Sequence, residues 1–186
     1  MDWVTRRKPR RKRGILRGHT PGIQYQSGLK LNQTCTFMQL TADWVVGFVD
    51  GEGCFHVGLV EHPNMSTGYQ VLPEFTVVQH ERDIQVLYAL KRFFGFGVVR
   101  KNHADRYAYR VRKLEHLERL CEFFLKHPLK TRKNVDFRKF RRVVLMMKEG
   151  RHLTREGLAE IIDLASSMNT GDRPRLEAIK AQLAAG

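Results

Sequence analysis

The sequence predicts an α+β domain, in which a four-stranded antiparallel sheet carries helices on one face. Residues 54–60 and 70–79 are rich in β-forming side chains and are separated by turn residues around Pro63, so we expect them to pair as a hairpin. Residues 97–102 and 106–112 form a second expected hairpin. Helical segments lie between and outside the hairpins, which gives the order α-ββ-α-ββ-α. For that order the simplest arrangement packs the helices against one face of the sheet.

Helices are predicted where apolar residues recur at helical spacing. Thr41 can cap the first helix, whose apolar side chains end at Gly51 and Gly53. The same spacing predicts further helices over residues 81–94, 114–125, 134–148, 154–168 and 174–184. The strand expected at 106–112 alternates apolar residues with arginines, so one of its faces should be cationic.

Length and composition fit one domain with tails. The chain has 186 residues, of which 42% are hydrophobic and 28% are charged, as in ordinary globular proteins. No apolar run approaches the roughly 20 residues that a membrane-spanning helix needs, so we expect a soluble protein without a membrane partner. We predict a basic, disordered arm over residues 1–36, a domain over 37–172, and a C-terminal helix or tail over 173–186.

The charge balance favours a polyanionic partner. Lys plus Arg exceed Asp plus Glu by 33 − 19 = 14, and such an excess repels itself unless an anion compensates it. Residues 1–30 hold nine basic residues and one acidic residue, or +8, which leaves +6 for the remainder. Nucleic acid is therefore the leading candidate. The arginine-rich block at 6–13 has three open interpretations: DNA phosphate contact, an address signal, or an incidental extension.

Cysteine usage predicts a reduced, intracellular protein. Cys35, Cys54 and Cys121 are an odd number without paired spacing, and no apolar signal segment precedes them. The eight histidines do not combine with them into the short paired spacings of a zinc site. An organelle (chloroplast or mitochondrion) and a bacterial cytoplasm are both open as the compartment.

The segment WVVGFVDGEG at residues 44–53 joins an apolar helix to two carboxylates set among glycines. Gly47 and Gly51 lie four residues apart on one helical face, where the missing side chains let a second backbone approach. Asp50 and Glu52 stand about 200° apart around a helix, so only one of them is expected at the shared end of such a helix pair.

Two copies of this helix that cross at the glycines would bring two carboxylates together. Like charges repel at that distance unless hard cations such as Mg²⁺ lie between them. Such ions orient a phosphate, lower the pKa of a bound water and stabilise the leaving oxygen, as phosphodiester hydrolysis requires. The spacing alone is equally typical of an ordinary buried helix that ends in a Gly-rich turn.

The same segment resembles the motif of the LAGLIDADG homing endonucleases, in a variant that reads GFVDGEG. The resemblance continues in the family's order through PEFTVVQH at 73–80, VLYAL at 86–90, GFGVVR at 95–100 and PLKTRKNVDF at 128–137. It spans about residues 40–150. It implies the αββαββα homing-endonuclease fold and a site-specific double-strand DNA endonuclease, which cleaves a long pseudo-palindromic target to promote intron mobility.

The resemblance also implies roles near the end of the first helix. Glu52 takes the metal-binding acidic position, helped by the carbonyl of Gly51, and Gln79 takes the place that positions water. The catalytic cation is expected to be one of three basic residues, Lys130, Arg132 or Lys133. Lys133 is slightly preferred. The expected cofactor is Mg²⁺ or another divalent cation such as Mn²⁺, with Ca²⁺ in a complex that does not cleave.

One motif occurs in this sequence, so one chain would supply half an active site. The resemblance to single-motif members therefore implies a homodimer. The residues expected at the dimer interface are Trp44, Gly47, Phe48 and Gly51. The two half-sites in the DNA should lie about one helical turn apart.

The other face of the sheet is expected to read double-stranded DNA in the major groove, where polar side chains match the donors and acceptors of base edges. Strand alternation selects the residues on that face. The predicted DNA-binding residues are His56, Gln70, Glu74, Thr76, Arg100, Asn102, Arg106, Arg110 and Arg112.

Two other functions compete with cleavage. An intron maturase, or a cleavage-dead DNA- or RNA-binding protein, shares the fold but loses the acid, so Glu52 argues for cleavage. A basic RNA-binding module could stack bases on Tyr107 and Tyr109, but alternation places them opposite the arginines, in the core. Asp83 departs from the family's pattern, because several relatives carry a basic residue near there; a carboxylate can instead cap the following helix.

Overall fold

The computed structural model describes residues 38–169 and 173–185, and the predicted arm and Cys35 lie outside them. The helices are α1 (Ala42–Glu52), α2 (Ile84–Phe94), α3 (Leu114–Lys126), α4 (Lys133–Lys148), α5 (Arg155–Ser166) and α6 (Pro174–Ala185), with short 3-10 helices η1 (Glu81–Asp83) and η2 (Arg151–Leu153). The strands are β1 (Gly53–Glu61), β2 (Tyr69–His80), β3 (Val98–His103) and β4 (Arg106–Val111). Among these helices none is long and apolar enough to cross a membrane.

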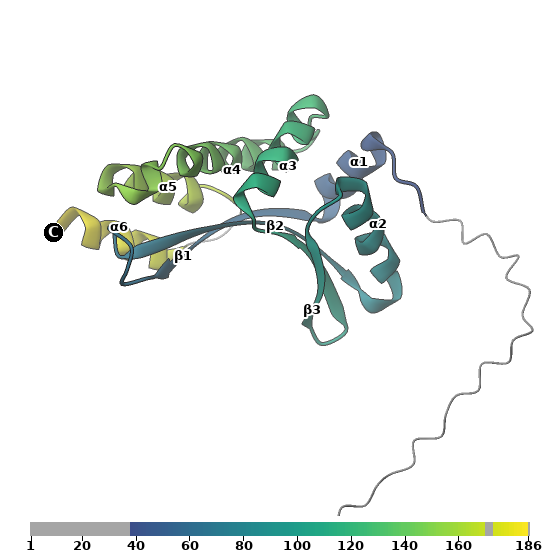
Figure 1. Ribbon diagram of the computed structural model, residues 1–186, viewed down its shortest axis with the longest axis horizontal. Coiled ribbons are helices and arrows are strands. Elements are labelled where there is room, and N and C mark those ends of the chain that lie inside the picture. The colour runs from purple at the N-terminus through teal and green to yellow at the C-terminus, as the bar shows by residue number, and fades with distance from the viewer. Residues whose placement is uncertain (1–37, 170–172, 186) are drawn as a thin grey trace, which may run out of the picture. The chain divides into compact units, whose positions relative to one another are not determined.

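The four strands form one sheet in the order β1-β2-β4-β3, and each neighbouring pair is antiparallel. Helices α3, α4 and α5 lie along one side of this sheet (Figure 1). The predicted α+β class and the two hairpins separated by a helix are confirmed. Strand and helix boundaries differ from the predicted ones by only a few residues, because turn and cap residues mark most of them.

The core lies between the helices and one face of the sheet. Phe55 on β1, Phe75 on β2 and Tyr109 on β4 are each at most 1% exposed, and Phe124 and Phe140 pack around them from α3 and α4. Burying one such side chain stabilises the fold by about 1.5–3 kcal/mol. The buried Tyr109 hydroxyl donates a hydrogen bond to the carbonyl of Phe96 at 3.1 Å, so this polar group is satisfied in the core.

Two expected caps have different outcomes. The Thr41 hydroxyl accepts a hydrogen bond from the backbone N–H of Trp44 at 3.2 Å, so the predicted N-cap of α1 is confirmed. Asp83 stands at the N-cap position of α2, but its side chain makes no capping hydrogen bond there, and the expected cap was wrong. The chain enters α2 through η1, where the His80 ring accepts the N–H of Arg82 at 3.1 Å and satisfies an early donor instead.

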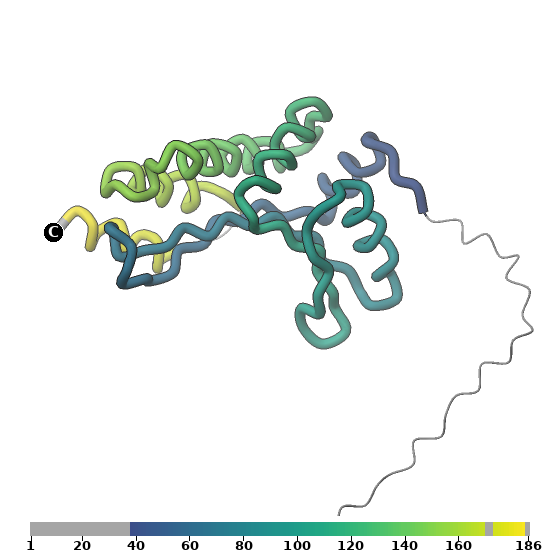
Figure 2. Tube along the Cα trace, in the orientation of Figure 1, coloured from purple at the N-terminus to yellow at the C-terminus, as the bar shows by residue number. Residues whose placement is uncertain are grey.

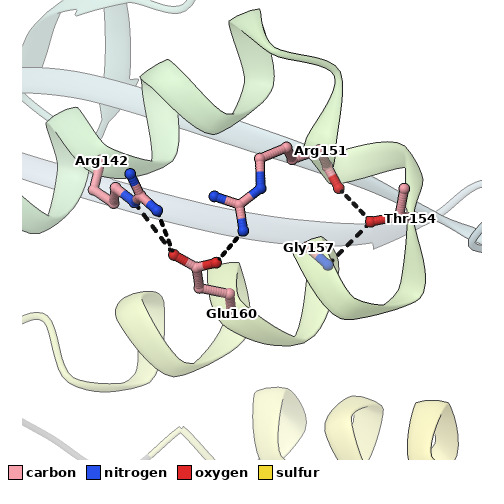
Figure 3. Close-up of polar contacts among 5 residues, drawn as sticks. All are labelled: Arg142, Arg151, Thr154, Gly157 and Glu160. Carbon is pink, nitrogen blue, oxygen red and sulfur yellow. Dashed lines mark hydrogen bonds and ion pairs between the residues drawn. The ribbon is translucent and has the colours of Figure 1, made fainter.

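An ion cluster joins α4, η2 and α5 (Figure 3). The carboxylate of Glu160 accepts hydrogen bonds from Arg142 at 3.1 and 3.2 Å and from Arg151 at 2.5 Å. The hydrogen bond from Arg142 is the main reason that the pKa of Glu160 lies below its usual value. Next to the cluster, a Cβ on Gly157 would stand 2.0 Å from the carbonyl of Arg151, so only glycine fits where α5 meets η2.

Asn169 and Arg173 contact the outer edge of β1. Asn169 donates its side-chain amide to the carbonyl of Phe55 at 3.1 Å, and Arg173 donates to the carbonyl of Val57 at 3.4 Å. Helix α6 then lies beside the end of the β1–β2 hairpin (Figure 2), where the Tyr69 hydroxyl donates to Gln182 at 2.8 Å. These contacts occupy backbone acceptors that an edge strand would otherwise leave free.

Candidate active site and nucleic-acid interface

The C-terminal end of α1 gathers polar groups from three elements. Glu52 is the last residue of α1, and its carboxylate accepts a hydrogen bond from the side-chain amide of Gln79 at 3.2 Å. Gln79 lies two residues after Val77, which pairs with Gly53, so the end of β2 passes directly beside the end of α1. Because its NH₂ group donates to Glu52, the amide oxygen of Gln79 is available to orient a water molecule.

A lysine approaches the same helix end from α4. The ammonium of Lys133, the first residue of α4, donates to the carbonyl of Gly51 at 3.3 Å. The side chains of Lys130 and Arg132 are exposed, and Lys130 meets α1 through its backbone N–H. Of the three predicted cations, Lys133 is therefore the one whose charged group lies beside the carbonyl of Gly51.

The two carboxylates of the motif have separate partners. The carboxylate of Asp50 accepts hydrogen bonds from the backbone of Lys130 at 2.7 Å, from the backbone of Thr131 at 3.3 Å and from the Thr131 hydroxyl at 2.8 Å. Glu52 is exposed and pairs with Gln79. Asp50 and Glu52 stand about 200° apart around the helix, and this spacing predicts that the two carboxylates have different partners. The contact between Asp50 and the loop before α4 was not predicted, because it joins residues 80 positions apart.

The donor set at the end of α1 suits a hard divalent cation. The carboxylate of Glu52 and the carbonyl of Gly51 offer oxygen ligands, which Mg²⁺, Mn²⁺ and Ca²⁺ prefer. In the part of the chain that the structure describes, no group of three or more His, Cys, Asp or Glu side chains lies close enough to hold a metal ion. The oxygen donors at the end of α1 are of the type that the predicted metal prefers, and Glu52 is the carboxylate among them.

One face of α1 is largely exposed. Trp44 is 40% exposed and stacks on Phe48 at 4.7 Å between ring centroids. A Cβ built on Gly47 or Gly51 meets no atom within 4 Å. Together Trp44, Gly47, Phe48 and Gly51 form a stripe at helical spacing, which we call the α1 stripe. A second backbone could approach it closely.

The nine predicted DNA-binding residues share the face of the sheet that points away from the core, which we call the open face. Register shows this directly, because His56 pairs with Glu74 and Thr76 pairs with Arg110, one step out of phase with the buried Phe75. Asn102 stands at a register shift between β3 and β4, and it reaches the same face. Arg112, just after β4, contacts Glu74 on the same face. The residues placed by register are His56, Gln70, Glu74, Thr76, Arg100, Arg106 and Arg110.

Charges on the open face are linked across strands. The carboxylate of Glu74 accepts a hydrogen bond from Arg112 and lies 3.9 Å from the guanidinium of Arg110, which in turn donates to Asn102. A hollow of about 340 Å³ beside them is lined by Gly97, Val98, Arg100, Arg110, Arg112, Lys113 and His116. The hydroxyl of Thr76 and the Nε of Arg110 are buried without a hydrogen-bond partner among the described residues. These two groups are therefore unsatisfied polar atoms within the face.

His56 lies on the outer strand of this face. Burial lowers the pKa of His56, and the nearby charge of Arg173 lowers it further. Arg173 also contacts the outer edge of β1, and the sequence did not identify it as a neighbour of this face.

Comparison with known proteins identifies the family. Residues 45–144 match the family model described as LAGLIDADG endonuclease. Probable intron-encoded endonuclease 3 of Neurospora crassa is 31% identical over 131 residues, which are 69% of this chain and 25% of that protein. The chain therefore matches about a quarter of that curated relative's length.

Two solved structures share the fold. The crystal structure of a homing endonuclease, I-TnaI, has 62% identity and a TM-score of 0.76, and the match covers 78% of this chain and 99% of that one. I-SmaMI bound to an uncleaved DNA target in the presence of calcium ions has 35% identity and a TM-score of 0.74, over 77% of this chain and 50% of that one. The chain belongs to the LAGLIDADG endonuclease family.

Proposed function

We propose that this protein is a site-specific double-strand DNA endonuclease of the homing type, which cleaves a long pseudo-palindromic target and thereby promotes intron mobility. The observation that carries this function is the arrangement at the end of α1, where Gln79 donates to the carboxylate of Glu52 and Lys133 donates to the carbonyl of the preceding residue, Gly51. The relative from Neurospora crassa is named an intron-encoded endonuclease, and I-TnaI is named a homing endonuclease. The compartment stays a prediction from the sequence.

We propose that the active form is a homodimer of a single-motif chain. Each protomer would supply one α1 stripe and one Glu52, and two stripes crossing at Gly47 and Gly51 bring the two helix ends together. The match to I-TnaI covers 99% of that chain, whereas the match to I-SmaMI covers half of that one. These two coverages support one αββαββα unit in each protomer of this protein.

The proposed mechanism divides the work among three side chains. Glu52 and the Gly51 carbonyl would hold Mg²⁺, which lowers the pKa of a bound water and stabilises the leaving oxygen when it is present. Gln79 would orient the attacking water through its free amide oxygen. Lys133 would place its positive charge against the charge that develops on the scissile phosphate.

We propose that the open face lies in the major groove and reads bases with its nine polar residues. Three of its arginines, Arg100, Arg110 and Arg112, line one hollow, and an arginine contacts guanine with two parallel hydrogen bonds. The I-SmaMI structure contains a DNA target, which supports the same kind of partner for this chain. Glu52 favours cleavage over the maturase or cleavage-dead alternative, since those relatives lose the acid.

The test first uses the wild-type protein to select, from a randomised pool, a DNA duplex that it cleaves with Mg²⁺. The variant Glu52→Gln is then assayed on that duplex. We expect cleavage to be abolished and DNA affinity to be kept, because the amide keeps the shape of the side chain but weakens metal binding. The matched control is Glu156→Gln, the same change at an exposed glutamate of α5, which should cleave normally. Retained cleavage by Glu52→Gln would overturn the assignment.

A further inference from the structure

The loop over residues 129–132 sets where the first turn of α4 begins. Leu129 is 2% exposed and anchors one end of this loop in the core. Arg132 stands at the N-cap position of α4 but offers no side-chain capping bond. The loop itself meets the first N–H groups of α4: that of Lys133 donates to the Thr131 hydroxyl, and those of Asn134 and Val135 donate to the carbonyls of Thr131 and Arg132. The carboxylate of Asp50 in turn accepts hydrogen bonds from this loop.

Asp50 is linked to Lys133 through one side chain. The Thr131 hydroxyl donates to Asp50 Oδ1 at 2.8 Å and accepts the backbone N–H of Lys133 at 3.3 Å. The N–H groups of Lys130 and Thr131 also donate to the same carboxylate, at 2.7 and 3.3 Å. A carboxylate that accepts three donors is a strong and directional anchor.

Asp50 and Gly51 are adjacent, so the same turn of α1 holds the loop and receives the lysine. Asp50 binds the backbone that leads into Lys133, and the carbonyl of Gly51 accepts the Lys133 ammonium. Both oxygens of Asp50 already accept N–H or O–H donors from the loop. These hydrogen bonds direct the Asp50 carboxylate to the loop before α4. We propose that Asp50 is a positioning residue, which places the ammonium of Lys133 for cleavage and acts only through that lysine.

This inference rests on the proposed function, because it needs Lys133 to act on the phosphate. Replacing the carboxylate with an amide in Asp50→Asn turns one acceptor into a donor that faces the loop's own N–H groups. The first turn of α4 then loses its fixed place, and the lysine shifts. A displacement of about 1 Å in a catalytic group costs about a hundredfold in rate.

The experiment measures single-turnover cleavage of the selected duplex with saturating protein and Mg²⁺. We expect Asp50→Asn to slow cleavage about a hundredfold. DNA affinity and the Mg²⁺ concentration for half-maximal rate should stay as in the wild type. The decisive variant is Asp50→Asn with Lys133→Met, which should cleave no more slowly than Lys133→Met alone, since a residue that acts through another adds nothing once that one is gone.

Two results separate the possible failures. If the double variant is slower than Lys133→Met by the same factor that Asp50→Asn shows alone, Asp50 acts independently and the inference is wrong. If Lys133→Met alone cleaves at the wild-type rate, the proposed role of the lysine is wrong, and the inference fails with it. A changed Mg²⁺ requirement in Asp50→Asn would make Asp50 a metal ligand and also overturn the inference.

A second pair of variants tests the same link when Asp50→Asn does not fold. Thr131→Val keeps the shape of the side chain but removes the hydroxyl that joins Asp50 to Lys133, and it should slow cleavage with unchanged DNA affinity. Thr131→Ser keeps the hydroxyl and should restore the rate; equal rates for the two variants would contradict the inference. The control Asp163→Asn removes an aspartate that binds Lys180 between α5 and α6, and cleavage should not change.

Discussion

The end of α1 and the open face of the sheet are both polar, but they are built in different ways. At the end of α1 three groups from distant parts of the chain meet through single hydrogen bonds of 3.2 and 3.3 Å. On the open face, most of the nine side chains are arrayed by strand register over four strands. The first arrangement depends on the position of individual atoms, whereas the second depends on which residues alternate outward.

This difference leads us to expect different failures in the two regions. Loss of one group at the helix end removes a transition-state interaction, and affinity for DNA stays. Loss of one group on the open face removes part of a distributed interface, so affinity or base discrimination falls while the rate on bound DNA stays. Variants in each region test whether loss of cleavage and loss of DNA binding stay separate.

The largest effect is expected at the α1 stripe with Gly47→Leu. No atom lies within 4 Å of a Cβ at this position, so the leucine fits the single chain, and replacing a helical glycine should favour the helix by about 1 kcal/mol. The same side chain would keep a second α1 from approaching. We expect a folded monomer in sedimentation at micromolar concentration, with double-strand cleavage lost.

The control for that variant is Ala178→Leu, which adds the same side chain at an exposed position of α6. This variant should sediment and cleave as the wild type does. A Gly47→Leu protein that remains a dimer and still cuts both strands would show that the α1 stripe is not the interface. The proposed sharing of an active site between two helix ends would then be wrong.

A smaller effect is expected on the open face with Arg110→Ala. Arg110 stands in the middle of the face, and its Nε is buried without a hydrogen-bond partner among the described residues. Loss of a base contact of this kind costs about 1–3 kcal/mol and relaxes selection at one base pair. Binding to a panel of single-base variants measures this, and cleavage of saturated DNA should keep its rate.

Arg155→Ala is the matched control, because it removes the same charge from an exposed position at the start of α5. It should bind the whole panel almost as the wild type does. If Arg110→Ala weakens all duplexes equally, Arg110 contacts the phosphate backbone and carries no sequence information. If it instead slows cleavage of saturated DNA, the two regions are coupled and the division drawn between them fails.

Much of the fold and of the open face could be predicted because both follow from local periodicity. Alternation along one strand is enough to place Arg106 and Arg110 opposite Tyr109, and a Gly-rich stop is enough to end α1 near Glu52. Such patterns need no knowledge of distant residues. The resemblance in order along the chain then added Gln79, which the structure places against Glu52.

The rest depends on contacts between distant residues that no local pattern records. The sequence favoured Lys133 only slightly over Lys130 and Arg132, and the fold shows which side chain reaches Gly51. The Asp50 contact with Thr131 spans 81 positions. The contact of Arg173 with the edge of β1 spans 116. Each forms because packing brings two loops or ends together, which composition and spacing do not specify.

The smallest effect on DNA binding is expected with Glu74→Gln, and this variant should bind random DNA more tightly than the wild type. The Glu74 side chain is 14% exposed and lies between the guanidinium groups of Arg110 and Arg112. Removing its charge makes the face more cationic, so affinity for random DNA should rise by about twofold to fivefold. The two arginines also lose the partner that orients them, and we expect discrimination between the target and random DNA to fall about tenfold.

Competition binding of target and random duplexes at one salt concentration measures both changes together, because salt alone alters non-specific affinity. The control Glu177→Gln removes the same charge from the exposed first turn of α6 and should change neither. An equal loss of affinity for both duplexes would show that Glu74 supports the fold of the sheet. A selective loss at one base pair would make Glu74 a reader of that base, since a carboxylate accepts from the amino group of cytosine. With the expected result, the open face derives its selectivity from a partly buried acid, Glu74, that orients the neighbouring arginines.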